Sequence, residues 1–304
     1  MIGIIILNYN TWNETELCVN SIREFNTSPY MIYVVDNCSK DESIQKLEMQ
    51  YKEAADVVLI RNNSNTGYSS GNNVGIRQAV KDECEYIFIV NSDVELMNDA
   101  FTIMIETLKH TPDGMMIGPS VKDNSGQESQ LPRHVLTPSV FLYERHPLCL
   151  IPYFRRKADR LVHEDENPVV FDGSVAGCCF GIKTEDFKRV GYFDEGVFLY
   201  YEEDILGYKM KAIGKKAIYE KSAKVWHKAN ISTNKEGSAF VQFHRWTSVL
   251  YMLKKYAHIN KMQQIGISLW NIVSWDILSI GSSSHRKMLR EFRKKNWGIV
   301  FEKR

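Results

Sequence analysis

The sequence lacks the features that mark several common classes of protein. Its formal net charge is +1 over 304 residues, so it has neither a global basic field for nucleic acid nor the acidic composition of a disordered chain. The apolar stretch at 265–280 contains Asn271 and Asp276 and falls short of the roughly 20 residues that a membrane-spanning helix needs. The first eight residues have no basic flank and no cleavage site, so we expect a strand there and not a signal peptide.

Two further signatures are missing. Six cysteines are present, but none forms a C-x-x-C pair or a regular framework, and free thiols in a reducing cytosol are therefore the expectation. The sequence also has no Walker loop and no G-x-G-x-x-G fingerprint. It therefore lacks the signatures of P-loop nucleotidases and of dinucleotide-binding enzymes.

Short apolar runs alternate with helical segments in the first third of the chain. The runs at 4–7, 30–35, 56–60 and 86–90 are rich in Val, Ile, Phe and Tyr, which is typical of strands buried on both faces. The segments at 11–25 and 41–51 have helical composition, and a third, at 65–79, is a loop that runs into a helix. Strands that alternate with helices imply right-handed crossovers and a mostly parallel sheet, so we predict an α/β fold.

Each of these predicted strands stops on polar residues. In open α/β sheets ligands bind outside the carboxyl ends of the strands, which predicts a nucleotide site at this edge. Asp36 would accept a hydrogen bond from a base or a ribose, and Tyr9 would flank the base. The alternative is that these residues only form Asx-rich turns. The candidate donor-binding residues here are Asn8, Tyr9, Asn10, Asp36, Asn37, Asn91 and Ser92.

A loop rich in Gly, Asn and Ser follows the third predicted strand and runs into a helix. Glycines let a backbone approach a ligand, and the free N–H groups at a helix start favour a phosphate or a polar sugar. We therefore add Asn65, Gly67 and Asn72 to the candidate donor-binding residues.

Asp93 follows the most apolar of the strands and is the candidate metal ligand. Mg²⁺ and Mn²⁺ need only one or two protein carboxylates when substrate phosphates and water complete the oxygen shell. One exposed Asp beside a diphosphate would therefore suffice.

These motifs carry a resemblance to a known family. Ile-Leu-Asn-Tyr-Asn at 6–10, Val-Asp-Asn-x-Ser at 35–39, Asn-x-Gly at 65–67 and Asn-Ser-Asp at 91–93 follow the order and rough spacing of the family 2 glycosyltransferases. The chain most resembles the bacterial branch that includes rhamnosyltransferases. The resemblance implies a GT-A fold, a nucleoside diphosphate sugar as donor and Mg²⁺ or Mn²⁺ as cofactor. It places Asp36 near the base and ribose, and makes Asp93 the last acid of a DxD-like motif whose first acid is Asn91 here.

A second acidic cluster stands at Glu202-Glu203-Asp204, after an aromatic-rich run. Three acids at the start of a helix could simply complement the helix dipole. By resemblance this is the acceptor motif, with Glu203 as the base that takes the proton of the acceptor hydroxyl and Asp204 as the runner-up. The resemblance also places His227 at the metal or diphosphate, although an isolated His is more often an ordinary residue. Lys228, Asn230 and Ser232 would lie near the same phosphates.

Two regions carry other expectations. Residues 120–168 are irregular and predict a mobile loop or an insertion with a short helix. Apolar residues at helical spacing predict an amphipathic helix over 239–256, and the basic residues at 286–295 favour either an anionic membrane surface or packing on the chain's own domain or a dimer partner. We expect a catalytic domain at 1–238, with a nucleotide half at 1–115 and an acceptor half at 116–238, and a helical extension at 239–304.

Together these features predict an inverting glycosyltransferase that acts in the cytoplasm, at the inner face of the membrane. It would move a sugar from a UDP- or dTDP-sugar to a hydroxyl of a growing, lipid-linked cell-surface glycan. Asp93 and Glu203 would then face one sugar from opposite sides. Two rival interpretations remain. The first is a sugar nucleotidyltransferase, which would carry a basic, glycine-rich phosphate loop near the first strand, where this sequence has none. The second is a module that binds a nucleotide sugar or a glycan without catalysis.

Overall fold

The computed structural model describes residues 1–145, 152–153, 156, 159–162, 165–228, 238–268, 286–288 and 290–291. The chain divides into two compact units. The first comprises Met1–Val135, Leu161–Glu195 and Glu202–Ser232, and the second comprises Leu136–Arg160, Gly196–Tyr201 and Thr233–Arg304. The boundaries predicted from the sequence remain a prediction.

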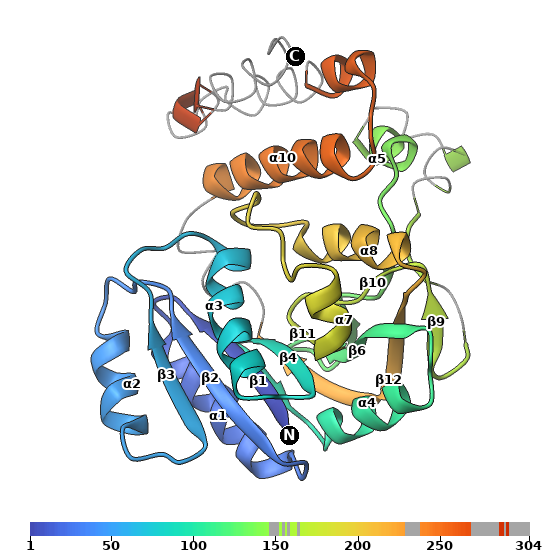
Figure 1. Cartoon of the computed structure of the whole chain (residues 1–304). Coiled ribbons are helices and arrows are strands. Elements are labelled where there is room, and N and C mark those ends of the chain that lie inside the picture. Colours follow the sequence, from blue (N-terminus) through green and yellow to red (C-terminus); the bar gives the residue numbers. More distant parts are fainter. Residues whose placement is uncertain are drawn as a thin grey trace. The chain divides into compact units, whose positions relative to one another are not determined.

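Four parallel strands form one half of the sheet, in the order β3-β2-β1-β4 (Figure 1). All four predicted strands are confirmed to within two residues at each end. The register pairs Asn8 with Asp36 and Leu7 with Asn91, so three strand ends are level at one edge. The strands are β1 (Ile2–Asn8), β2 (Tyr30–Asp36), β3 (Val57–Arg61) and β4 (Tyr86–Asn91), and they are joined by helices α1 (Trp12–Phe25), α2 (Ser43–Tyr51) and α3 (Tyr68–Lys81).

The rest of the sheet is mixed. Strand β11 (Cys179–Lys183) runs antiparallel to β4, and the order continues through β6 (Gly114–Lys122) and β12 (Lys216–His227) to β5 (Val94–Leu96). Strand β12 is irregular, because its register with β6 shifts between Glu220 and Lys224. Short strand β9 (Val169–Phe171) pairs with β12. The helices of this half are α4 (Ala100–Lys109), α7 (Thr184–Arg189) and α8 (Glu202–Ala212).

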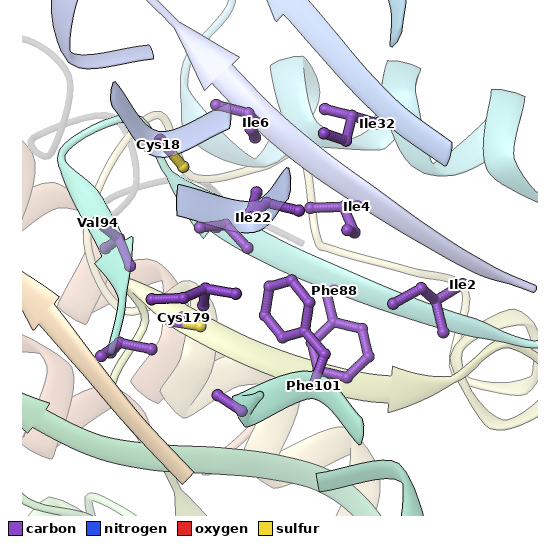
Figure 2. Close-up of a cluster of buried hydrophobic side chains, with 14 of the residues drawn as sticks. Ile2, Ile4, Ile6, Cys18, Ile22, Ile32, Phe88, Val94, Phe101 and Cys179 are labelled. Atoms are coloured by element: carbon purple, nitrogen blue, oxygen red, sulfur yellow. The ribbon is translucent and has the colours of Figure 1, made fainter. Parts of the chain in front are cut away.

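Apolar side chains cover both faces of the sheet, as the unbroken apolar runs predicted. On β1, Ile4 and Ile6 belong to the cluster under α1, α2 and α4, while Ile5 belongs to the cluster under α3, α7 and α8. Figure 2 shows the first cluster, in which the rings of Phe88 on β4 and Phe101 on α4 lie 4.4 Å apart between centroids. Burying each such side chain contributes about 1.5–3 kcal/mol, which holds the polar strand ends in fixed positions.

The insertion at 120–168 contains β7 (Glu128–Ser129), β8 (Arg133–His134) and α5 (Pro138–Arg145). Strand β8 pairs with β10 (Gly173–Ser174). The expected short helix is therefore present, and parts of this segment lie outside the described residues.

The amphipathic helix predicted over 239–256 is α10 (Ser238–Lys255). Half of the basic segment at 286–295 and most of the apolar stretch at 265–280 lie outside the described residues. Among the residues that the structure describes, no helix combines the length and the apolar character needed to cross a bilayer.

Candidate functional site

Buried hydrogen bonds join the ends of β1 and β2. Asn8 Nδ2 donates to Asp36 Oδ1 at 2.8 Å, and Ser39 donates to both carboxylate oxygens, from Oγ at 2.5 Å and from its backbone N–H at 3.1 Å. Asn8 is fully buried and Asp36 is 4% exposed. Both side chains therefore hold the strand ends together, and contact between Asp36 and a nucleotide stays a prediction.

The same network reaches β4 and the loop after β1. Thr11 Oγ1 lies 3.2 Å from Asn8 Oδ1 and 3.0 Å from Ser92 Oγ, so Ser92 is also held by the protein. The backbone N–H of Asn10 donates to Ser39 Oγ at 2.9 Å. Tyr9 and Asn10 are half-buried, so both keep some exposed surface at this edge.

The start of α3 is fixed by three amide side chains. Asn37 Nδ2 donates to Asn65 Oδ1 at 3.0 Å, and the same oxygen accepts from the N–H of Gly67 at 3.1 Å. Gly67 has a φ of 100°, a backbone conformation that favours glycine. Asn72 Nδ2 donates to the carbonyl of Tyr68 at 3.0 Å. These predicted donor-binding residues thus form the loop that positions α3.

The two predicted metal ligands lie together. Strand β12 pairs with β5 so that His227 stands opposite Val94, and His227 Nε2 lies 3.2 Å from Asp93 Oδ1. Gln130 Nε2 lies 2.5 Å from the other ring nitrogen, Nδ1. Burial would lower the pKa of His227, but hydrogen bonds to Asp93 and Cys178 outweigh it and raise that pKa to about 10. Without a metal, the imidazole therefore carries a proton toward Asp93.

This pair fits a divalent cation that is bound mainly by its substrate. Two ligands on adjacent corners of an octahedron, each about 2.1 Å from the metal, are about 3 Å apart, close to the 3.2 Å between Asp93 Oδ1 and His227 Nε2. Within the described part of the chain, no group of three or more His, Cys, Asp or Glu side chains is placed to hold a metal ion. The other ligands would have to come from phosphate oxygens and water.

Lys228 places a cation beside these ligands. Its backbone N–H donates to the carbonyl of Asp93 at 3.0 Å, and its Nζ lies 2.6 Å from Glu95 Oε1 and 5.1 Å from the centroid of the Trp226 ring. Asn230 and Ser232, the other predicted phosphate neighbours, lie outside the described residues.

The predicted base lies against a glycine. Glu203 is in the first turn of α8 and is half-buried, and a Cβ added to Gly177 would stand 1.7 Å from Glu203 Oε1. Any residue type other than glycine at position 177 would therefore clash with the Glu203 carboxyl where it now lies. Burial, aided by the charge of Asp204 and opposed by a backbone hydrogen bond, raises the pKa of Glu203 to about 7.

The segment Gly177-Cys178 connects the base to the metal ligands. Cys178 lies beside His227 and contributes to the raised pKa of that imidazole, and the Cys178 carbonyl accepts from the backbone N–H of Asn91 at 2.8 Å. Glu203 thus lies against Gly177, and the next residue, Cys178, lies beside His227, the partner of Asp93. Gly177 was not among the candidate residues predicted from the sequence.

Two more residues escaped the sequence analysis, and both are on α3. The hydroxyl of Tyr68 lies 3.0 Å from Asn91 Oδ1 and 3.1 Å from the carbonyl of Gly177. Asn73 Nδ2 donates to the carbonyl of Phe193 at 3.1 Å and to Glu195 Oε1 at 2.8 Å, while Asn73 Oδ1 accepts from the N–H of Phe193 at 3.2 Å. In the sequence, Tyr68 lies within the glycine-rich loop. The signal for the contacts of Asn73 with Phe193 and Glu195 was a polar residue on a face of the predicted helix.

Comparisons with known proteins show the family and the fold of the chain. The sequence model of the family described as Glycosyl transferase family 2 matches residues 3–189, more than half of the chain. A curated relative is the N-acetylglucosaminyl-diphospho-decaprenol L-rhamnosyltransferase of Mycobacterium tuberculosis. It is 24% identical over 272 residues, which cover 84% of this chain and 85% of the relative.

Two solved structures share the fold. The mannosyltransferase PcManGT from Pyrobaculum calidifontis, solved with GDP-Man and Mn²⁺, superposes with a TM-score of 0.56 at 14% identity, over 100% of this chain and 88% of that one. GalNAc-T7, solved with UDP, GalNAc and Mn²⁺, gives a TM-score of 0.58 at 16% identity over 76% of this chain. The match spans only 44% of the GalNAc-T7 chain. The predicted GT-A fold is confirmed.

Proposed function

The chain belongs to glycosyl transferase family 2, and from that premise we propose that it transfers a sugar, with inversion, from a nucleoside diphosphate sugar to a hydroxyl of a lipid-linked glycan. Its activity as a glycosyltransferase follows from the family. The inversion, the donor, the acceptor and the use of a metal are the proposal.

One observation carries the proposal: the Glu203 carboxyl and the Asp93–His227 pair flank the same segment, Gly177-Cys178. A transferase needs a positive centre at the leaving diphosphate and a base at the acceptor, on opposite sides of one sugar. A carboxyl whose pKa is about 7 is suited to accept a proton near neutral pH.

In the proposed reaction Glu203 takes the proton of the acceptor hydroxyl. The acceptor oxygen forms a bond to the anomeric carbon while the bond from that carbon to the diphosphate oxygen breaks, and one displacement inverts the centre. Asp93 and His227 would hold Mg²⁺ or Mn²⁺, which supplies positive charge for the leaving diphosphate. The amide and hydroxyl network around Asp36 keeps the nucleotide edge in place.

The substrate classes are proposed from the relatives. The mycobacterial relative is named as a rhamnosyltransferase that acts on a decaprenol-linked N-acetylglucosamine diphosphate, which supports a lipid-linked acceptor and a dTDP- or UDP-sugar donor here. A site for such an acceptor would lie near the cytoplasmic face of the membrane.

A donor screen tests the proposal. The full chain is incubated with UDP-glucose, UDP-N-acetylglucosamine, dTDP-rhamnose or GDP-mannose, with Mg²⁺ or Mn²⁺, and with N-acetylglucosaminyl diphosphoundecaprenol in micelles. We expect one donor to be consumed and the product to have the inverted anomeric configuration by NMR. No turnover of any donor with either metal would contradict the proposed substrates, and binding without turnover would favour the non-catalytic module.

Matched variants identify the base. Glu203→Gln keeps the shape of the side chain and removes the proton acceptor, so we expect turnover to fall by about 10²–10⁴-fold with donor binding retained. Asp204→Asn makes the same change one residue away and should leave most of the activity. The reverse result would assign the base to Asp204.

Membrane contact is a separate part of the proposal. Deletion of residues 281–304 should weaken binding to vesicles that contain anionic phosphatidylglycerol, because the basic residues of this segment would be lost. Unchanged vesicle binding would contradict it, and a change of oligomeric state instead would support the alternative of a homodimer.

A further inference from the structure

We propose that Tyr68 is a positioning residue for the transfer reaction. Its hydroxyl joins the Asn91 side chain, at the end of β4, to the Gly177 carbonyl, and so holds the surface on which the Glu203 carboxyl rests. This inference rests on the function proposed above.

The contacts of the Tyr68 hydroxyl carry the first step. It lies 3.0 Å from Asn91 Oδ1 and 3.1 Å from the Gly177 carbonyl oxygen, both within hydrogen-bond distance. The backbone N–H of Asn91 donates in addition to the Cys178 carbonyl at 2.8 Å. The end of β4 is therefore tied to the Gly177-Cys178 segment by one direct bond and one that passes through Tyr68.

The second step runs from Gly177 to the base. The Cβ position of Gly177 is 1.7 Å from Oε1 and 2.4 Å from Cδ of Glu203, so the carboxyl packs directly on this backbone. A shift of the Gly177 peptide would move the surface that supports the carboxyl. Misplacing a catalytic group by about 1 Å can cost as much as 10²-fold in rate.

The third step concerns Asn91, which occupies the position of an acid in the DxD-like motif. A phenol has one proton, so Tyr68 can donate to one oxygen at a time. An Asn side chain can turn its amide and donate to the phenol oxygen while the phenol donates to Gly177, which satisfies both contacts. An ionised Asp is an acceptor only. The Tyr68 hydroxyl would then donate its hydrogen bond to the Asp and no longer to the Gly177 carbonyl. We infer that Asn91 serves Tyr68 and is not a weakened metal ligand.

The surroundings support this geometry. Burial raises the pKa of Tyr68 well above its ordinary value, and the charges of Glu203, Glu202 and Asp93 add to the effect. The phenol therefore stays protonated, and its hydroxyl lies within the field of both the base and the metal ligand. The Tyr68 ring packs edge-on against Phe193, with centroids 6.1 Å apart, so Tyr68→Phe removes the hydroxyl while the ring contact remains.

The main test compares two tyrosines. Tyr68→Phe should lower kcat by about 10–100-fold, leave the KM for the donor within twofold, and shift the acidic limb of the pH profile that reports Glu203. Tyr33→Phe is the control, because Tyr33 donates at 2.7 Å to Asp82, the residue at the other end of α3. The Tyr33 hydroxyl also lies 3.7 Å from Cys84 Sγ, so each variant loses a hydroxyl with two contacts. The thermal midpoint of Tyr33→Phe should therefore fall by a similar amount, while its kcat stays within twofold of wild type.

A double mutant tests the role of Asn91. At saturating Mn²⁺, Asn91→Asp should lower kcat as Tyr68→Phe does, and adding it to Tyr68→Phe should cost less than a further twofold, since the two residues act through one contact. If Asn91 were only a weakened metal ligand, Asn91→Asp would tighten Mn²⁺ binding, measured by electron paramagnetic resonance, and keep kcat at or above wild type.

The outcomes separate this inference from the function on which it rests. A wild-type protein that consumes no donor in the screen overturns both. A wild type that is active and depends on Glu203, together with a Tyr68→Phe variant that keeps the wild-type kcat and pH profile, overturns the role of Tyr68 alone.

Discussion

The two acids of the site are held in opposite ways. Asp93 stands at a strand end and faces a partner of opposite charge, because the proton on His227 lies toward its carboxylate at 3.2 Å. Glu203 stands at a helix start against the bare backbone of Gly177. Burial acts to lower the pKa of His227, but its interactions with Asp93 and Cys178 outweigh burial and raise that pKa to about 10, whereas burial with little compensation raises the pKa of Glu203 to about 7. Environment alone thus suits one acid to a cation and the other to a proton.

The largest effect should come from a methyl group on the base side. Gly177→Ala places a Cβ where Glu203 Oε1 lies, 1.7 Å away, so the carboxyl must move, and we expect kcat to fall by about 10²-fold or more. Gly266→Ala adds the same methyl where no heavy atom lies within 4 Å and should leave kcat unchanged. Full activity of Gly177→Ala would contradict this view, because activity would then not depend on the packing of the Glu203 carboxyl against Gly177.

At the predicted metal site, Mn²⁺ binding should release the proton of His227. Replacing His227 should therefore make Mn²⁺ binding less dependent on pH. A metal must displace the proton that His227 holds below pH about 10, so the affinity for Mn²⁺ should rise about tenfold per pH unit from pH 6 to 8. His227→Ala should bind Mn²⁺ more weakly and with a flatter pH dependence. A wild type whose affinity does not change with pH would argue against His227 as a ligand. Electron paramagnetic resonance of free Mn²⁺ gives both affinities.

For Glu203, protonation should instead appear in the pH dependence of kcat/KM. Glu203 must be deprotonated to act, and its pKa is raised to about 7. At saturating metal, kcat/KM should therefore fall about tenfold per unit as the pH drops below 7. Asp204→Asn should keep this acidic limb and Glu203→Gln should abolish it. An acidic limb near pH 4 in the wild type would mean that burial does not tune the base in the active complex.

The smallest effects should appear where α3 supports the base side at a distance. Asn73 is 1% exposed and makes three hydrogen bonds to residues 193–195, so Asn73→Ala should lower the free energy of unfolding by about 2 kcal/mol. Arg77 contacts the same Glu195 at 2.7 Å, but both side chains are exposed, at 51% and 43%, and Arg77→Ala should cost under about 1 kcal/mol. Urea unfolding measures both. Equal effects would show that the buried amide is not the main contact.

The comparison also separates what local patterns reveal from what they do not. Apolar runs predicted β1 to β4, because a strand buried on both faces needs an unbroken apolar run. The abrupt polar ends predicted an edge where Asn8, Asp36 and Asp93 gather. The same pattern could not show that Asp36 accepts hydrogen bonds from Asn8 and Ser39 within the protein. The local sequence around a carboxylate at a strand end is the same whether the carboxylate contacts a ligand or a neighbouring loop.

The amino-acid sequence by itself determined the order of elements and the parallel half of the sheet, because strand burial, helix starts and polar strand ends depend on neighbouring residues. It also supplied Asp93 and Glu203 as candidates for the two acids, and their roles stay a proposal. Only the tertiary structure decided that Gly177 receives the Glu203 carboxyl and that Tyr68 connects Asn91 to that glycine. The family resemblance had placed His227 and Asp93 at one site, and the structure supplied the 3.2 Å between them. These contacts join segments that lie far apart along the chain, and their positions follow from how β4, β11, β12 and α8 pack, which no local pattern specifies.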